Sequence, residues 1–297
     1  MTAGERGFLL LTSSFGDPER RVLTVAQLRN LAARVRMSLP SDQQRELTVE
    51  DLVKLDCQRP KAERILALLS DEQRLDRYIS KGKASGCQPI TRVTPTYPVQ
   101  LRRRLGDDSP GCLWAKGDVS LLKTPAVALV GSRDLGECNV EFAREAGKQA
   151  ALQGYTLVSG NARGADREAQ EACLAHGGSV ICVVADKLEQ HRLRSNVLYL
   201  SEEGYDLPFT AQRALSRNRV IHCLGCVVLV AQCTFGKGGT WDGSLKNLRH
   251  GWSPVFCFAD GSPGIGELLA MGAEAIGLWE LQDLRMLTAS IQKIFDQ

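Results

Sequence analysis

The sequence predicts an α/β protein: a doubly wound, mostly parallel sheet with a small helical N-terminal domain. From residue 126 onward, short apolar runs alternate with stretches of helical periodicity, which is typical of repeated βα units. Before residue 90 the periodicity is helical. The length of 297 residues allows one large domain and one smaller domain.

Composition and charge restrict the class of protein. The chain is 43% hydrophobic and 24% charged, as in soluble globular proteins. The formal net charge is only +3, so any basic surface must be local. Because we find neither a membrane-spanning apolar stretch nor a signal sequence, we expect a cytoplasmic protein without membrane contact.

The ten cysteines are scattered through apolar contexts, which favours reduced thiols over a disulfide framework. Cys223 and Cys226, with His222 beside them, leave two interpretations open: small buried residues, or a metal or redox site. A metal site would need a second pair of ligands, which the spacing does not supply. We favour buried residues and expect no cofactor and no metal.

Residues 1–90 are expected to form the helical N-terminal domain. Thr48 and Asp51 resemble a capping box at the start of one helix. Residues 81–86 are expected to form a loop. Such a domain could contact nucleic acid or a protein, or could serve as a structural cap. Apolar periodicity predicts further helices at residues 23–35, 62–69 and 75–79.

Residues 91–125 are expected to be a connector rich in turns, because Pro95 and Pro98 exclude a regular helix at their positions. Residues 101–105 place a basic cluster on a short predicted helix. This cluster is either a solvated face or a nucleic-acid contact.

The α/β domain is expected over residues 126–280, and residues 281–297 are expected to form a C-terminal amphipathic helix. The first strand, 126–130, ends at a glycine turn and leads into a helix. Further apolar runs predict strands at residues 155–159, 180–184, 197–200, 226–231 and 255–258.

Glycine-containing loops follow predicted strands and open predicted helices at residues 131–133, 160–166 and 236–240. Because ligands bind beyond the carboxyl ends of strands in such a sheet, we expect these loops at one rim. Their backbone N–H groups, hydroxyls and cations suit a phosphate ligand. The candidates from these loops are Gly131, Ser132, Arg133, Ser159, Gly160, Arg163, Lys237, Gly239 and Thr240.

The loops do not match the common nucleotide enzymes. Neither GxGxxG nor GxxxxGK[ST] occurs in them. The four histidines have no convincing nucleophile and acid around them. We therefore assign no catalytic residue and expect a binding protein that is not an enzyme.

Several segments follow the order and spacing of a known family: Tyr97-Pro98, residues 127–133, residues 158–166, residues 217–221 and Gly239-Thr240. On these segments the chain resembles the DNA-processing protein A (DprA/Smf) family over most of its length. The resemblance implies an extended Rossmann-like domain that binds single-stranded DNA, often as a homodimer. It also implies loading of a RecA-type recombinase in recombination or natural transformation. The pocket it implies comprises Ser132, Arg133, Gly160, Arg163, Arg217, Asn218, Arg219 and Lys237.

The chain departs from the family pattern in several places. The family's Gly-Ile-Asp is Gly164-Ala165-Asp166 here, and no winged-helix sequence follows residue 280. We therefore expect a divergent member without the C-terminal winged helix. Divergent relatives act as antitoxins in phage-defence toxin–antitoxin modules, so a cognate toxin is the alternative partner.

A third possibility is a nucleotide-binding sensor or a phosphoribohydrolase-like enzyme on the same rim. Those enzymes carry a glutamate in a GGxGTxxE turn. Gly243 stands at that place here, and Asp242 is one residue away. Hydrolysis is therefore the less favoured prediction.

Overall fold

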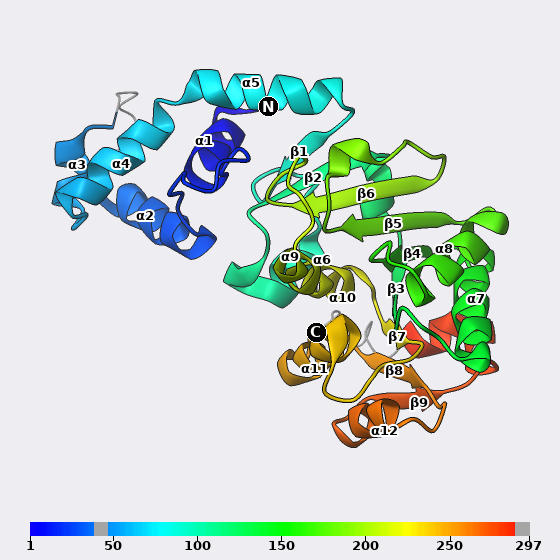
Figure 1. Ribbon diagram of the computed structural model, residues 1–297. Coiled ribbons are helices and arrows are strands. Elements are labelled where there is room, and N and C mark those ends of the chain that lie inside the picture. Colours follow the sequence, from blue (N-terminus) through cyan, green and yellow to red (C-terminus); the bar gives the residue numbers. More distant parts are fainter. Residues whose placement is uncertain (39–46, 289–297) are drawn as a thin grey trace.

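The computed structural model describes residues 1–38 and 47–288 (Figure 1). The strands in this part of the chain are β1 (Gln88–Thr91), β2 (Cys112–Gly117), β3 (Ala126–Val130), β4 (Thr156–Ser159), β5 (Ser179–Val184), β6 (Val197–Glu202), β7 (Val228–Val230), β8 (Val255–Phe258) and β9 (Glu274–Ile276). The α-helices are α1 (Ala3–Thr12), α2 (Val25–Ser38), α3 (Val49–Lys54), α4 (Arg59–Leu69), α5 (Glu72–Ala84), α6 (Val99–Leu105), α7 (Glu137–Leu152), α8 (Ala165–Ala175), α9 (Ala211–Ser216), α10 (Asn218–Leu224), α11 (Gly238–His250) and α12 (Pro263–Ala270).

All of these strands belong to one sheet, in the order β1-β2-β6-β5-β4-β3-β7-β8-β9. The strands from β6 to β9 in this order pair in parallel, whereas β2 pairs antiparallel with both β1 and β6. The chain winds outward from β3 to β6 and then returns to β7 on the other side of β3. The predicted doubly wound, mostly parallel sheet is therefore confirmed.

Strand β3 is buried on both faces, as its continuous apolar run predicts. Val127 and Leu129 belong to the core on one face, and Ala128 and Val130 belong to the core on the other. This alternation follows from the two-residue period of a strand. Helices α7 and α8 pack on the first face, and α10 packs on the second.

The N-terminal helices lie beside the sheet, and α5 leads from them into β1 (Figure 1). Thr48 caps α3 through the predicted capping box with Asp51. The predicted loop at 81–86 is partly wrong, because α5 continues to Ala84. Its buried face extends to Gly82, which packs against the Trp114 ring.

The expected connector at 91–125 also contributes to the fold. It contains β2, which pairs with β1 and β6, and its Trp114 is fully buried. Tyr78 of α5 and Tyr205 pack on this ring, with the Tyr205 hydroxyl donating to the Tyr78 carbonyl oxygen at 2.9 Å. The expectation of a connector is therefore incomplete: it passes over the short apolar run Cys112 to Ala115, which forms most of β2.

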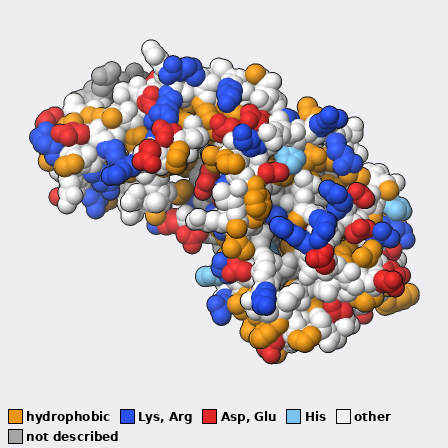
Figure 2. Space-filling model, in the orientation of Figure 1, with side chains coloured by type: hydrophobic (Ala, Val, Ile, Leu, Met, Phe, Trp, Pro, Cys, Tyr) orange, Lys and Arg blue, Asp and Glu red, His pale blue; other side chains and the backbone are white. Residues whose placement is uncertain are grey.

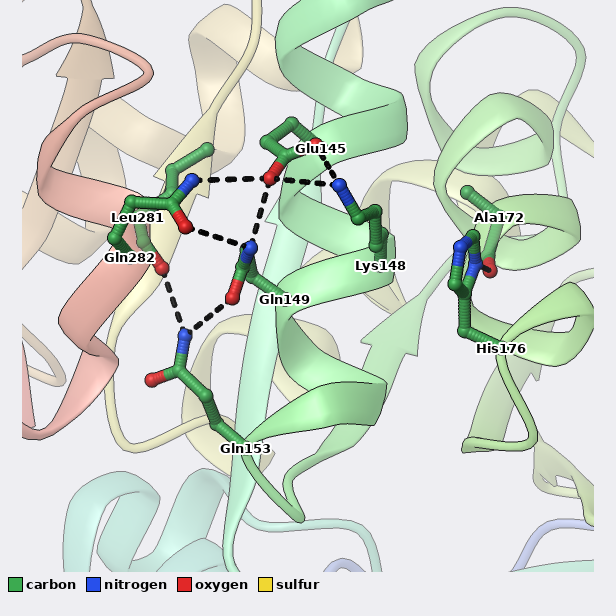
Figure 3. A network of polar contacts seen from close by, with 8 residues as sticks. All are labelled: Glu145, Lys148, Gln149, Gln153, Ala172, His176, Leu281 and Gln282. Atoms are coloured by element: carbon green, nitrogen blue, oxygen red, sulfur yellow. Dashed lines mark hydrogen bonds and ion pairs between the residues drawn. The ribbon is translucent and has the colours of Figure 1, made fainter.

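Glutamine side chains hold the C-terminal segment against α7 (Figure 3). Gln149 donates to the Gln282 side chain at 3.0 Å, and Gln153 donates to the Leu281 carbonyl oxygen at 2.8 Å. Of the helix predicted for 281–297, the described part begins in the 3-10 helix Glu280–Asp283 and is α-helical at 284–288, and residues 289–297 lie outside the described residues. Within the described part of the chain, no helix has the length and apolar character needed to span a membrane.

Candidate nucleic-acid interface

A groove runs along the carboxyl ends of β3, β4 and β5 and the loop after β7. It consists of two adjoining hollows that share Arg133, Ala162, Phe209, Ala214 and Arg217 in their walls. On the face shown in Figure 2, basic side chains gather over the α/β part, with a few acidic side chains beside them. The predicted site residues that line the groove are Gly131, Ser132, Arg133, Gly160, Arg163, Arg217, Asn218, Lys237, Gly239 and Thr240.

Arg217 lies at the centre of the groove, where the two hollows meet. Its guanidinium packs on Gly160, at the end of β4, and a Cβ there would come within 3.0 Å of the guanidinium nitrogens. Its buried Nε atom has no hydrogen-bond partner among the described residues. Arg217 lines both hollows, so its positive charge faces a ligand in the groove.

The negative charge of buried Asp166 compensates the positive charge of Arg217. Burial raises the pKa of the Asp166 carboxyl, and the positive charge of Arg217 opposes that rise. Burial likewise lowers the pKa of Arg217, and Asp166 opposes that effect. Asp166 also accepts hydrogen bonds from the backbone N–H groups of Gly160, at 3.0 Å, and Ala162, at 3.1 Å. These two N–H groups are occupied, so the expectation that they hold phosphate is wrong.

Polar contacts fix the three glycine loops to one another. The Thr240 hydroxyl donates to the Gly131 carbonyl oxygen at 2.9 Å, and the Asn218 amide donates to the Gly239 carbonyl oxygen at 2.9 Å. The Ala165 N–H donates to the Ser132 carbonyl oxygen at 3.2 Å. Thr240 and Asn218 therefore order the walls of the groove.

The N-terminus of α11 opens on the groove. The helix after the first glycine turn, α7, starts only at Glu137, and the N–H of Gly136 before it is bound to the Gln232 side chain. Lys237 precedes α11 without a side-chain cap, and Gly238 to Thr240 line the groove. Free N–H groups at a helix start favour an anion.

Two predicted site residues lie outside the groove. Ser159 is fully buried and its hydroxyl accepts from the Gln170 side chain, so it cannot reach a ligand. Arg219 forms an ion pair with buried Glu202 at 2.5 Å and lines a separate cavity beside residues 12–25. The prediction that these two residues bind the ligand is therefore wrong. Side chains alternate between the two faces along β4, which turns Ser159 into the core, and the first turn of α10 directs Arg219 away from Arg217.

Glu202 is the buried partner in that second cavity. Burial raises the pKa of its carboxyl to about 7, although the charge of Arg219 counteracts this rise. Its Oε1 atom has no hydrogen-bond partner among the described residues. This pair joins the end of β6 to the start of α10.

The remaining cations of the groove differ in whether they form ion pairs with described residues. Arg163 pairs with Asp134 at 2.5 Å, but both side chains are largely exposed, so the pair is weak. Arg133 and Lys237 are exposed, and no ion pair with a described residue involves either of them.

Two of the groove residues that the sequence analysis did not single out carry groups suited to binding a nucleotide. Phe209 is 56% exposed, although large apolar side chains in this fold are mostly buried. Asp186 follows β5 and lines the same hollow. The available signal for Phe209 was its place between Pro208 and Thr210, in a segment without the regular apolar spacing of a helix or strand.

His222 and Cys223 are buried in the hydrophobic core and do not form a metal site with other described residues. His222 is fully buried, which lowers its pKa to about 3, and its Nδ1 atom lies 3.1 Å from the Asn247 amide. Burial raises the pKa of the Cys223 thiol to about 12. No group of metal-ligating side chains occurs among residues 1–38 and 47–288.

Comparisons with known proteins agree with this architecture. The family model described as DNA recombination-mediator protein A matches residues 88–284. DNA processing protein DprA of Streptococcus pneumoniae is 32% identical over 184 residues, which cover 57% of this chain and 64% of that protein. The DprA protein of Bacillus subtilis is 27% identical over 227 residues, 71% of this chain and 74% of its own. Protein Smf of Escherichia coli is 33% identical over 166 residues, 51% of this chain and 44% of its own.

The fold is similar to solved DprA structures. The S. pneumoniae structure has a TM-score of 0.71 at 24% identity and covers 93% of this chain and 95% of that one. A Helicobacter pylori structure has a TM-score of 0.56 at 24% identity and covers 70% and 96%. The chain thus spans 64% of the S. pneumoniae sequence and less than half of the E. coli one. Since the family model covers most of the α/β part, the chain belongs to the DNA recombination-mediator protein A family.

Proposed function

We propose that the groove binds single-stranded DNA and that the protein acts in DNA processing and recombination as a binding protein, without catalysing a reaction. The observation that carries this proposal is Arg217, which is held on Gly160 and lines both hollows of the groove. A guanidinium in the wall of a groove binds phosphate oxygens through charge-assisted hydrogen bonds.

The neighbouring groups extend this anion site into a path. Arg133 and Lys237 stand on opposite loops of the groove, and the N-terminus of α11 faces the same space. Phosphates spaced along a strand would be bound by these cations in turn. The family's description and the H. pylori DprA protein, which has a single-stranded DNA binding mode, support a DNA strand as the polyanion.

The exposed Phe209 ring supports a single strand over a duplex. Aromatic rings in basic grooves stack on unpaired bases, whose faces are covered in a duplex. Phe209 lines both hollows, so a strand bound to Arg133 and Arg217 would pass its bases beside this ring.

A nucleotide hydrolase is less well supported. Asp242, the carboxylate next to the position of the hydrolase glutamate, pairs with Lys246 at 2.8 Å along α11 and does not line the groove. No observation favours the antitoxin role. We keep a RecA-type recombinase as the proposed protein partner, because the family consists of recombination mediators, and homodimerisation stays a prediction.

Oligo-dT binding tests the proposal by gel shift over a range of salt concentrations. The double variant Arg133→Ala, Arg217→Ala should bind at least tenfold more weakly, with a salt slope reduced by about 1.5, because each phosphate that a cation neutralises adds about 0.7 to the slope. Arg144→Ala with Lys246→Ala removes the same charge from exposed positions outside the groove and is the matched control. Equal affinity of the two double variants would refute the proposal.

A further inference from the structure

The smaller hollow of the groove contains one carboxylate among its cations. Its volume is about 290 Å³, at the low end for ligand pockets. Arg133, Arg163 and Arg217 line it together with Asp186 and the ring of Phe209. A phosphate would be attracted by the arginines and repelled by Asp186.

Asp186 is held in place from behind. The Nε2 atom of His191 lies 2.8 Å from its Oδ1 atom, and the His191 ring stacks on Tyr199 with centroids 4.8 Å apart. The hydrogen bond from His191 lowers the pKa of Asp186, which favours the carboxylate form. Its side chain is 53% exposed.

This carboxylate retains capacity to accept hydrogen bonds. A carboxylate has about four acceptor sites, and the interactions of Asp186 with His191 and with its own backbone N–H leave part of that capacity for a ligand. A group that approaches it must therefore donate. Inside a DNA strand the donors are the N–H groups of the bases, since the phosphate and sugar oxygens only accept.

We propose that Asp186 makes the groove select bases by the group at their edge: it accepts from an exocyclic amino group, as on cytosine, and disfavours a carbonyl oxygen there, as on uracil or thymine. Aspartate accepting from the cytosine N4 amino group is an established pairing chemistry. The inference rests on the proposed function, because the arginines must first bind the strand. Phosphate contacts fix the strand, and Asp186 reads one base.

A structural role for Asp186 makes a different prediction. The carboxylate also interacts electrostatically with Arg217 and Arg213. If it served only to position or neutralise these arginines, its loss would change the affinity for every strand by the same factor. A selecting role changes the ratio between strands.

Oligo-dC and oligo-dU of equal length separate these cases, since their bases differ in the amino or carbonyl group at position 4 and in the adjoining ring nitrogen. The wild-type protein should bind oligo-dC at least fivefold more tightly in fluorescence anisotropy. Asp186→Asn, whose amide both donates and accepts, should reduce this ratio to below two. Asp134→Asn removes the other exposed groove carboxylate and should leave the ratio unchanged.

Each result decides between the proposals. Tight and equal binding of both strands by the wild-type protein overturns the inference and leaves the proposed function standing. A ratio that survives Asp186→Asn also overturns it, provided that the melting temperature of the variant matches that of the wild type. Failure to bind either strand contradicts the proposed function itself.

Discussion

The guanidinium of Arg217 lies on the α-carbon of Gly160, in space that any other residue at position 160 would fill with a side chain. Asp166, the second residue of α8, accepts a hydrogen bond from the Gly160 N–H and compensates the guanidinium charge. The loop after β4 is thus built around an arginine supplied by a segment more than fifty residues later.

Gly160→Ala and Arg217→Ala should each weaken oligo-dT binding about tenfold, because the new methyl group at position 160 displaces the guanidinium. The double variant should be no weaker than either single variant, since both changes remove the same interaction. Equilibrium binding of all three variants checks this. Additive losses would show that Gly160 contributes independently of Arg217.

Phe209→Ala should weaken oligo-dT binding about fivefold or more, because base–aromatic stacking contributes about 1–3 kcal/mol per base. Phe209→Trp should retain binding. The matched control is Phe235→Ala, which removes a similarly exposed ring that does not line the groove. If Phe235→Ala weakens binding as much, the stacking assignment is wrong.

Glu202→Gln should flatten the dependence of stability on pH. The raised pKa of Glu202 means that the folded protein keeps a proton that the unfolded chain loses between pH 4.5 and about 7. The free energy of unfolding therefore falls as pH rises through this window, by at most about 3 kcal/mol. Urea denaturation at pH 5 and pH 8 measures this fall. An equal fall in Glu202→Gln would assign it to other groups.

Thr240→Val should destabilise the protein by about 1 kcal/mol, because the Gly131 carbonyl oxygen loses the hydroxyl that joins α11 to the end of β3. Thr240→Ser keeps the hydroxyl and should be close to wild type. Denaturation midpoints of the two variants provide the comparison, and a stable valine variant would argue against the hydrogen bond.

The α/β half of the fold could be predicted because its strands are continuous apolar runs between glycine turns. The run Ala126 to Val130 is buried along its whole length, as the sequence suggests. Strand β2 was harder, because a six-residue run between prolines and turn residues resembles a connector. Pairing with β1 and β6, which are separated from β2 in the sequence, makes this segment a strand, and the local sequence pattern does not show that pairing.

The rim of the groove could be predicted from loops that follow strands, but the direction of each side chain could not. Arg217 and Arg219 are two residues apart in similar surroundings, and one lines the groove while the other pairs with Glu202. The difference arises because Arg217 lies at the junction between α9 and α10, whereas Arg219 lies within α10 and pairs with the Glu202 carboxylate at the end of β6. Ser159 looked like a ligand donor by composition, and the pleat of β4 buries it.

The position of β7 beside β3 has a consequence for synthesis of the protein. A nascent chain that has reached residue 227 already contains Arg133, Arg163 and Arg217, yet it lacks the strand that supports the opposite wall. Lys237 and the start of α11 emerge later still. The capacity to hold a polyanion should therefore arise abruptly and late on the ribosome, when the second half of the sheet closes on the first.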